Sequence, residues 1–136
     1  MLFRSLAQRS DAINKIFEEN AARGIKDQRL LVIHVDSRGQ KQQTDTFLYY
    51  QKESKQSYNL AAKMLRTLES KYVGRRDFKG TLTTRDLHML RECKPTTVYV
   101  ELGNIRNSFD RKRLMLANNR QAIANWLAEG FMKTKI

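Results

Sequence analysis

Residues 96–100 read TTVYV, the most regular β-strand pattern in the chain, and this run of β-branched and aromatic residues ends at Glu101. The LGN tripeptide at residues 102–104 follows and predicts a turn. A second apolar run, LLVI at residues 30–33, ends at His34. An uninterrupted apolar run of this kind is typical of a strand that is covered on both faces, as in a parallel sheet.

Segments with helical periodicity lie around these strands. The predicted elements, in chain order, are a helix at 3–23 that ends at Gly24, strands at 30–33 and 46–50, a helix from the N-cap Ser54 to Lys71, an ambiguous segment at 82–92, the strand at 96–100, and two helices capped by Ser108 and Asn118. The predicted buried face of the helix after Ser54 is Tyr58, Ala61, Ala62, Leu65, Leu68 and Tyr72. Strands that alternate with helices indicate an α/β layered fold, with a mostly parallel central sheet flanked by helices.

The size and composition of the chain exclude several classes of protein. Its 136 residues are enough for one ordinary domain but not for two. Cys93 is the only cysteine, so an internal disulfide framework is excluded. No stretch approaches the roughly 20 apolar residues that cross a bilayer, and residues 1–6 lack the apolar core of a signal peptide. We therefore expect either a cytoplasmic chain or one whose natural N-terminus is missing.

The charge balance indicates a polyanionic partner or a solvated basic surface. There are 26 Lys and Arg residues against 14 Asp and Glu residues, which gives a formal net charge of +12. The densest basic clusters lie at residues 71–79 and 106–113. Neither cluster alternates with aromatic residues, and no zinc finger, RNP box or GXXG loop is present. We therefore expect no nucleic-acid partner, and leave open an anionic membrane surface or a cell-wall polymer.

His34 and Glu101 occupy equivalent positions, because each directly follows a predicted strand. If these strands are parallel neighbours, both side chains reach the crevice at the carboxyl ends of the strands. Imidazole is a good Zn²⁺ ligand, and a carboxylate beside a metal-bound water serves as a general base. The alternatives are a hydrogen-bonded structural histidine and a solvated edge carboxylate. A catalytic zinc also needs about three protein ligands. We interpret His88 as a surface residue or as a residue that supports a ligand, and Cys93 as a small core residue.

Several segments resemble one enzyme family in the same order along the chain. The sequence VYVELGNIRNSFD at residues 98–110 resembles the closing motif of the zinc-dependent N-acetylmuramoyl-L-alanine amidases of the amidase 3 family, in which a buried strand ends in Glu-Leu-Gly. The sequence VIHVDS at residues 32–37 is similar to the family's Ser-Ile-His-Ala-Asn segment, and LHMLRE at residues 87–92 is similar to its Val-Leu-Arg stretch. The last helices, from residue 113 to residue 130, also resemble the family's C-terminal end.

This resemblance implies a peptidoglycan hydrolase that cleaves the amide between N-acetylmuramic acid and the L-alanine of the stem peptide. It implies Zn²⁺ as cofactor, His34 as a zinc ligand and Glu101 as the catalytic carboxylate. It suggests that Asp36 orients His34 or holds its loop, and that Arg91 meets a substrate carboxylate or forms a structural ion pair. The implied partner is peptidoglycan, and the implied location is the periplasm or cell envelope.

One departure from the family pattern concerns the metal site. The family has two further zinc ligands, a His and a Glu, on the N-terminal side of the matched segments, and no histidine precedes His34 here. We therefore expect residues 1–136 to be the C-terminal part of one amidase catalytic domain that lacks its first strands. The alternative is a basic binding module for cell wall or another polyanion, which has kept the fold and lost the metal.

Overall fold

The computed structural model describes residues 5–37, 39, 42–73 and 78–136. The elements in chain order are α1 (Leu6–Ala22), β1 (Arg29–Asp36), β2 (Phe47–Tyr50), α2 (Lys55–Tyr72), β3 (Thr81–Thr83), α3 (His88–Glu92), β4 (Thr96–Asn104), α4 (Ser108–Met115) and α5 (Ala117–Lys133). The strand order is β1-β4-β2-β3, in which β1 and β4 are parallel, β2 and β3 are parallel, and β2 and β4 are antiparallel. This arrangement confirms the predicted α/β fold with a mostly parallel sheet.

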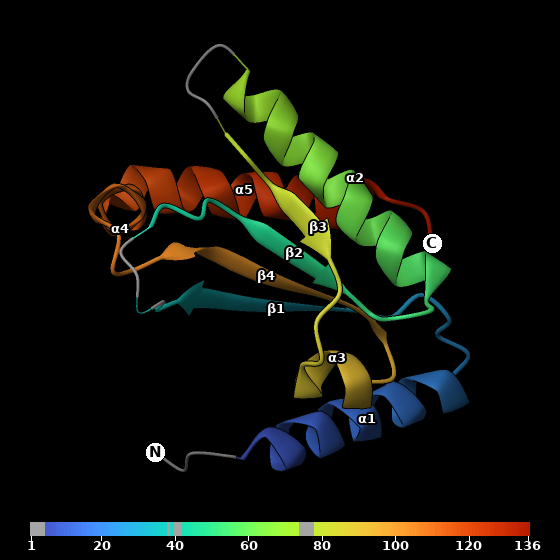
Figure 1. The fold of residues 1–136 in the computed structure, drawn as a ribbon. Coiled ribbons are helices and arrows are strands. Elements are labelled where there is room, and N and C mark those ends of the chain that lie inside the picture. The colour runs from blue at the N-terminus through green and yellow to red at the C-terminus, as the bar shows by residue number, and fades with distance from the viewer. Residues whose placement is uncertain (1–4, 38, 40–41, 74–77) are drawn as a thin grey trace.

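Alternating residues of β4 divide the core into two layers. Val98 and Val100 are fully buried and pack with α2 and α5 on one face of the sheet. Tyr99 lies on the other face, which α3 and α1 cover. Figure 1 shows the two layers above and below the sheet, with α4 beyond the carboxyl end of β4. Glu101 shares the face of Tyr99, because side chains alternate along a strand.

The expectation that the strand at residues 30–33 is covered on both faces is wrong. This strand, β1, lies at one edge of the described sheet, where it pairs with β4. Ile33 is 54% exposed and Val35 is 44% exposed, so this end of β1 is not covered on the face that Ile33 shares with Val100. An apolar run therefore did not distinguish an edge strand from a central one.

The predicted turn at residues 102–104 is also wrong, because β4 continues to Asn104. The pairing with β1 shifts register between His34 and Asp36, which is a β-bulge. Gly103 has a φ of +148°, and a Cβ there would lie 3.0 Å from the Arg113 guanidinium. This glycine lets the strand continue through the bulge in a conformation that other residues rarely adopt.

The four predicted helices are all present in the predicted order, but they differ in detail. Ser54 caps α2 by accepting a hydrogen bond from the Ser57 backbone, as expected. The buried face is rotated from the predicted one, because Tyr58 is 45% exposed and packs edge-on against Tyr50. The residues of α2 that are buried are Ser57, Leu60, Ala61, Ala62, Met64 and Leu68.

The predicted caps of the last two helices are wrong. Asn107, one residue before Ser108, caps α4 by accepting from the Asp110 backbone. The helix α5 begins at Ala117 after Leu116, without a side-chain cap, so Asn118 lies inside it. At Gly130 this helix packs so closely on α2 that a Cβ would lie 2.8 Å from the Cα of Met64.

The ambiguous segment at residues 82–92 contains both kinds of element, because β3 ends at Thr83 and α3 begins at His88. Part of the basic cluster at residues 71–79 lies outside the described residues. Within the described part of the chain, no helix is long and apolar enough to cross a membrane.

Candidate functional site

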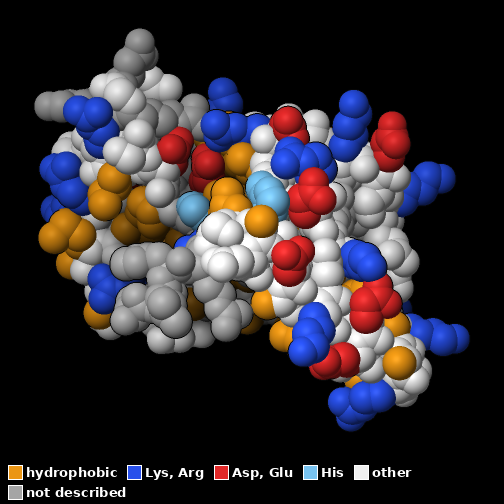
Figure 2. Space-filling model, turned by 90° about the horizontal axis from the view of Figure 1, so that it is seen from below, with side chains coloured by type: hydrophobic (Ala, Val, Ile, Leu, Met, Phe, Trp, Pro, Cys, Tyr) orange, Lys and Arg blue, Asp and Glu red, His pale blue; other side chains and the backbone are white. Residues whose placement is uncertain are grey.

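The structure brings His34 and Glu101 together at the carboxyl ends of β1 and β4. The two strands are parallel neighbours, and their register places His34 directly opposite Glu101. Paired residues on adjacent strands point to the same face, with the strands about 4.8 Å apart. An imidazole and a carboxylate therefore lie side by side on the face that carries α1 and α3. Figure 2 looks onto this side of the molecule, where histidine side chains lie among hydrophobic and acidic ones.

Glu101 is a buried carboxylate, and the side chains that contact it include Tyr49 and Arg85. It is 6% exposed. The Tyr49 hydroxyl on β2 donates to Glu101 Oε2 at 3.3 Å, and Arg85 Nη1 lies 3.6 Å from Oε1. The Arg85 guanidinium comes from the segment between β3 and α3 and is about half exposed. The carboxylate is therefore oriented from the β2 side and faces a cation at its solvent edge.

The side chain of His34 packs against the aromatic ring of Tyr99. Its imidazole is exposed and stacks on Tyr99, with ring centroids 4.9 Å apart and planes at 23°. Within the described residues, no group hydrogen bonds to its ring nitrogens. Stacking restricts the tilt of the ring while leaving the nitrogens at its edge available to a ligand.

The pKa of the Tyr99 hydroxyl depends on the charged groups of this site. Burial raises the pKa of Tyr99, the negative charge of Glu101 raises it further, and the Arg85 guanidinium opposes that rise. Phenol, carboxylate and guanidinium are thus close enough to interact electrostatically on the same face of the sheet.

We expect Glu101→Gln to lower the pKa of Tyr99 and Arg85→Gln to raise it, because each variant removes one of these charges. An NMR pH titration of the assigned Tyr99 resonance measures this shift among the five tyrosines. Because the folded-state pKa is raised, the unfolded state loses its proton first, so this contribution to stability is complete below about pH 10 and declines as the pH rises through the folded pKa. Glu92→Gln serves as the control, since Glu92 pairs with Arg91 on α3. Equal pKa values in all the variants would contradict the geometry.

Asp36 and Arg91 occupy different positions relative to the pair. Asp36 ends β1 two residues after His34, and its backbone carbonyl accepts from Ile105 N at 2.8 Å. Arg91, on α3, is paired with Asp86 and Glu92, with Nε 2.8 Å from Glu92 Oε1. Asp36 therefore contributes to the connection between the ends of β1 and β4, whereas Arg91 lies in an ion-pair cluster on α3.

His88 and Cys93 belong to the packing of α3. His88 Nε2 lies 2.9 Å from the hydroxyl of Ser10, which joins α3 to α1. Cys93 is 4% exposed, and burial raises the pKa of its thiol. Cys93 is thus the small core residue that the sequence predicted.

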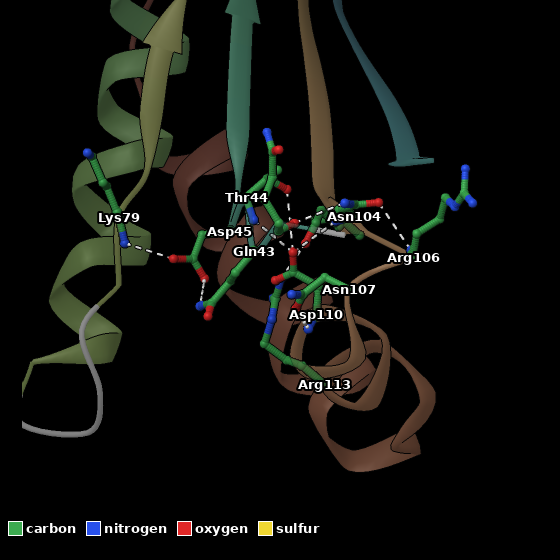
Figure 3. Close-up of polar contacts among 11 residues, drawn as sticks. Gln43, Thr44, Asp45, Lys79, Asn104, Arg106, Asn107, Asp110 and Arg113 are labelled. Carbon is green, nitrogen blue, oxygen red and sulfur yellow. Dashed lines mark hydrogen bonds and ion pairs between the residues drawn. The ribbon is translucent and has the colours of Figure 1, made fainter. Parts of the chain in front are cut away.

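A buried polar cluster fixes the chain just beyond Glu101 (Figure 3). Asp110 is fully buried, and its Oδ2 accepts from Asn104 N at 3.0 Å and Thr44 N at 2.9 Å. Asn107 Oδ1 accepts from Asp110 N at 2.9 Å. The Arg113 guanidinium donates to Leu102 O and lies 3.8 Å from Asp110 Oδ1. These contacts join the end of β4 to the segment before β2 and to α4.

Comparison with known proteins identifies the family. The family model for N-acetylmuramoyl-L-alanine amidase, Amidase_3, matches residues 4–133. The chain belongs to this amidase family. No curated protein sequence matches it.

Solved amidase structures share the fold. The chain is similar to the catalytic domain of CwlV from Bacillus (Paenibacillus) polymyxa, with 22% identity, a TM-score of 0.73, and coverage of 97% of this chain and 66% of that one. The corresponding values for an N-acetylmuramoyl-L-alanine amidase from Clostridium difficile 630 are 21%, 0.76, 96% and 64%. For the CwlD amidase of Clostridioides difficile, solved in complex with the GerS lipoprotein, they are 18%, 0.69, 96% and 65%. This amidase chain therefore spans slightly less than two thirds of the length of these relatives.

The described residues of this amidase chain do not form a complete metal site. A catalytic zinc takes about three protein ligands plus water. Among residues 5–37, 39, 42–73 and 78–136, no group of three or more His, Cys, Asp or Glu side chains is placed to hold a metal ion. His34 and Glu101 provide two adjacent side chains of suitable type. With Glu101 as the catalytic carboxylate, a complete catalytic zinc site therefore requires protein donors in addition to His34.

Tyr49 and Arg85 are components of the site that the sequence did not predict. Tyr49 lies in the predicted aromatic strand, and only the antiparallel pairing of β2 with β4 brings it to Glu101. Arg85 precedes α3 and lies in the segment at residues 82–92, for which the sequence predicted neither a helix nor a strand. The alternation of side chains between the two faces of β2 only weakly indicates that Tyr49 belongs to the site. No local sequence pattern indicates that Arg85 does.

Proposed function

We propose that this chain hydrolyses the amide between N-acetylmuramic acid and the L-alanine of the stem peptide in peptidoglycan, at the cell envelope. The observation that carries the proposal is the pairing of His34 with the buried carboxylate of Glu101 at the carboxyl ends of two parallel strands. Membership of the amidase family supports the bond that is cleaved, and residues 1–136 act as one catalytic domain or part of one.

In the proposed reaction Glu101 transfers the proton. Its carboxylate accepts a proton from the attacking water and delivers it to the nitrogen of the leaving L-alanine, which departs as an amine. Tyr49 and Arg85 contact different oxygens of this carboxylate, so they hold its plane in a fixed orientation. A fixed acceptor lowers the entropic cost of reaching the reactive geometry.

We propose His34 as the metal-ligating residue of the site, with Asp36 as the residue that holds its segment. The available edge of the imidazole supports this role, because neutral imidazole nitrogen is a common zinc ligand. The described residues do not fit a complete zinc site, so we derive no step through the metal. For Arg91 the pairing with Asp86 and Glu92 favours the ion-pair alternative over contact with substrate.

A digestion of purified peptidoglycan by the 136-residue chain tests the function. The chain is assayed with and without added Zn²⁺, and mass spectrometry identifies the products. We expect free stem peptides with a new N-terminal L-alanine, and glycan chains that keep the lactyl group. Cleavage between the sugars or within the peptide would contradict the proposed bond.

The alternative function, a basic binding module, predicts a different result in the same assay. It is supported by the net charge of +12 together with the incomplete metal site in the described residues. Absence of hydrolysis with and without Zn²⁺, combined with cell-wall binding that weakens as salt increases, would favour this alternative over the amidase.

A further inference from the structure

A hollow with two arginines lies just past the candidate catalytic pair. It has a volume of about 470 Å³ and is lined by Ile105, Arg106, Asn107, Ser108 and Arg111. The lining residues come from the segment that joins β4 to α4 and from the first turns of α4. The hollow therefore lies at the carboxyl end of β4, the end of an open α/β sheet at which ligands bind.

Within the described part of the chain, the two guanidinium groups of this hollow have no acidic partner. Both side chains are exposed. Arg111 Nη1 donates to the Ile105 carbonyl at 3.3 Å, and among the described residues no carboxylate is in ion-pair contact with Arg106 or Arg111. By contrast, Arg85 and Arg91 each face a carboxylate. Two such cations beside one hollow favour an anion, and guanidinium forms paired hydrogen bonds with a carboxylate or phosphate.

The backbone that carries Arg106 is rigidly held. Asn104 Oδ1 accepts from Arg106 N at 3.1 Å, and Asn104 Nδ2 donates to the Gln42 carbonyl at 2.9 Å. The side chain of Asn104 is fully buried. Figure 3 shows Arg106 at the end of β1, turned away from the cluster around Asp110. A charged group on a fixed loop can select a ligand geometry, because little ordering is needed on binding.

The position of the hollow relative to Glu101 suggests which part of the substrate reaches it. Ile105 lies four residues after Glu101, which is at most about 13 Å along an extended chain at 3.3 Å per residue. This distance is about the span of four extended residues. Beyond the scissile amide the sugar side consists of neutral N-acetylated units, whereas the peptide side carries free carboxylates. A cationic hollow at this distance suits the peptide side.

We propose that Arg106 and Arg111 form a subsite that binds a free carboxylate of the stem peptide. This inference rests on the proposed function and specifies which side of the substrate extends past β4. The subsite acts in binding and lies outside the reacting centre.

Binding of a synthetic stem peptide to the full chain tests the subsite without requiring hydrolysis. The probes are a peptide with free carboxylates, the same peptide with carboxamides, and inorganic phosphate, each titrated by NMR. We expect Arg106→Gln/Arg111→Gln to weaken binding of the free-carboxylate peptide at least 10-fold, and we expect conversion to carboxamides to weaken binding to the native chain by a similar factor. We expect the Arg106→Gln single variant to keep the fold, since this side chain makes no hydrogen bond or ion pair within the described residues.

The control is Lys63→Gln/Arg66→Gln, which removes the same charge from the exposed face of α2. We expect its affinity for the peptide to stay within 2-fold of the native value. Equal weakening in both double variants would overturn the subsite in favour of a general charge effect. Tighter binding of phosphate than of the peptide would overturn it in favour of a phosphate-bearing polymer. Hydrolysis of peptidoglycan together with unchanged peptide binding in Arg106→Gln/Arg111→Gln would reject the subsite while leaving the amidase function standing.

Discussion

Glu101→Gln is expected to reduce the rate of peptidoglycan amide hydrolysis by about 10²–10⁴-fold, the usual contribution of a general acid–base group. Glutamine has nearly the same shape, and its amide oxygen can still accept the hydrogen bond from Tyr49. It cannot take the proton of water at neutral pH. The variant therefore removes the chemistry of the side chain while preserving most of its packing.

The loss is measured as the initial rate of release of N-terminal L-alanine under conditions in which the native chain is active. Glu92→Gln is the matched control, since Glu92 also pairs with an arginine but lies on the exposed side of α3. Circular dichroism of both variants checks the fold. Hydrolysis rates for Glu101→Gln and Glu92→Gln within 2-fold of each other would contradict the proposed role of Glu101 in proton transfer.

The contacts of Glu101 show which parts of the site local sequence can predict. Two strands, each followed by a polar residue, were recognisable from composition, so His34 and Glu101 were identified. Their juxtaposition depends on β1 and β4 being neighbours, although residues 37–95 lie between these strands along the chain. Tyr49 reaches Glu101 only because β2 lies antiparallel to β4, a pairing that no local pattern specifies. The partners of a site are therefore harder to predict than its strand-end residues.

The errors in the predicted fold have a related cause. An apolar run such as residues 30–33 predicts a strand but does not indicate whether another layer covers it. The exposure of Ile33 was therefore not predicted. The sequence at residues 102–104 contains a glycine, which is equally compatible with a turn and with a bulge. Pairing with β1 and the bonds to Asp110 keep Asn104 in the strand. Tertiary contacts outweighed local propensity at both positions.

Asp110→Ala is expected to lower the free energy of unfolding by about 3–5 kcal/mol, the usual cost of removing one member of a buried ion pair. The Asp110 carboxylate is fully buried and accepts backbone hydrogen bonds from Thr44 and Asn104. Alanine leaves both N–H groups without this acceptor. It also leaves the guanidinium of Arg113, which is 8% exposed, without its nearby negative charge. Because small domains are stable by only about 5–15 kcal/mol, this loss is a large fraction of the total.

Urea denaturation followed by circular dichroism measures this effect, with a lower midpoint and an unchanged slope as the expected result. Asp86→Ala is the matched control, because Asp86 also pairs with an arginine, Arg91, but is 84% exposed. Surface ion pairs contribute little, so the control midpoint is expected to stay near the native value. Asp110→Asn keeps one acceptor oxygen and is expected to fall between the two. Equal midpoints for Asp110→Ala and Asp86→Ala would mean that the cluster beyond Glu101 does not hold the end of β4, and the rigid placement of Arg106 would lose its basis.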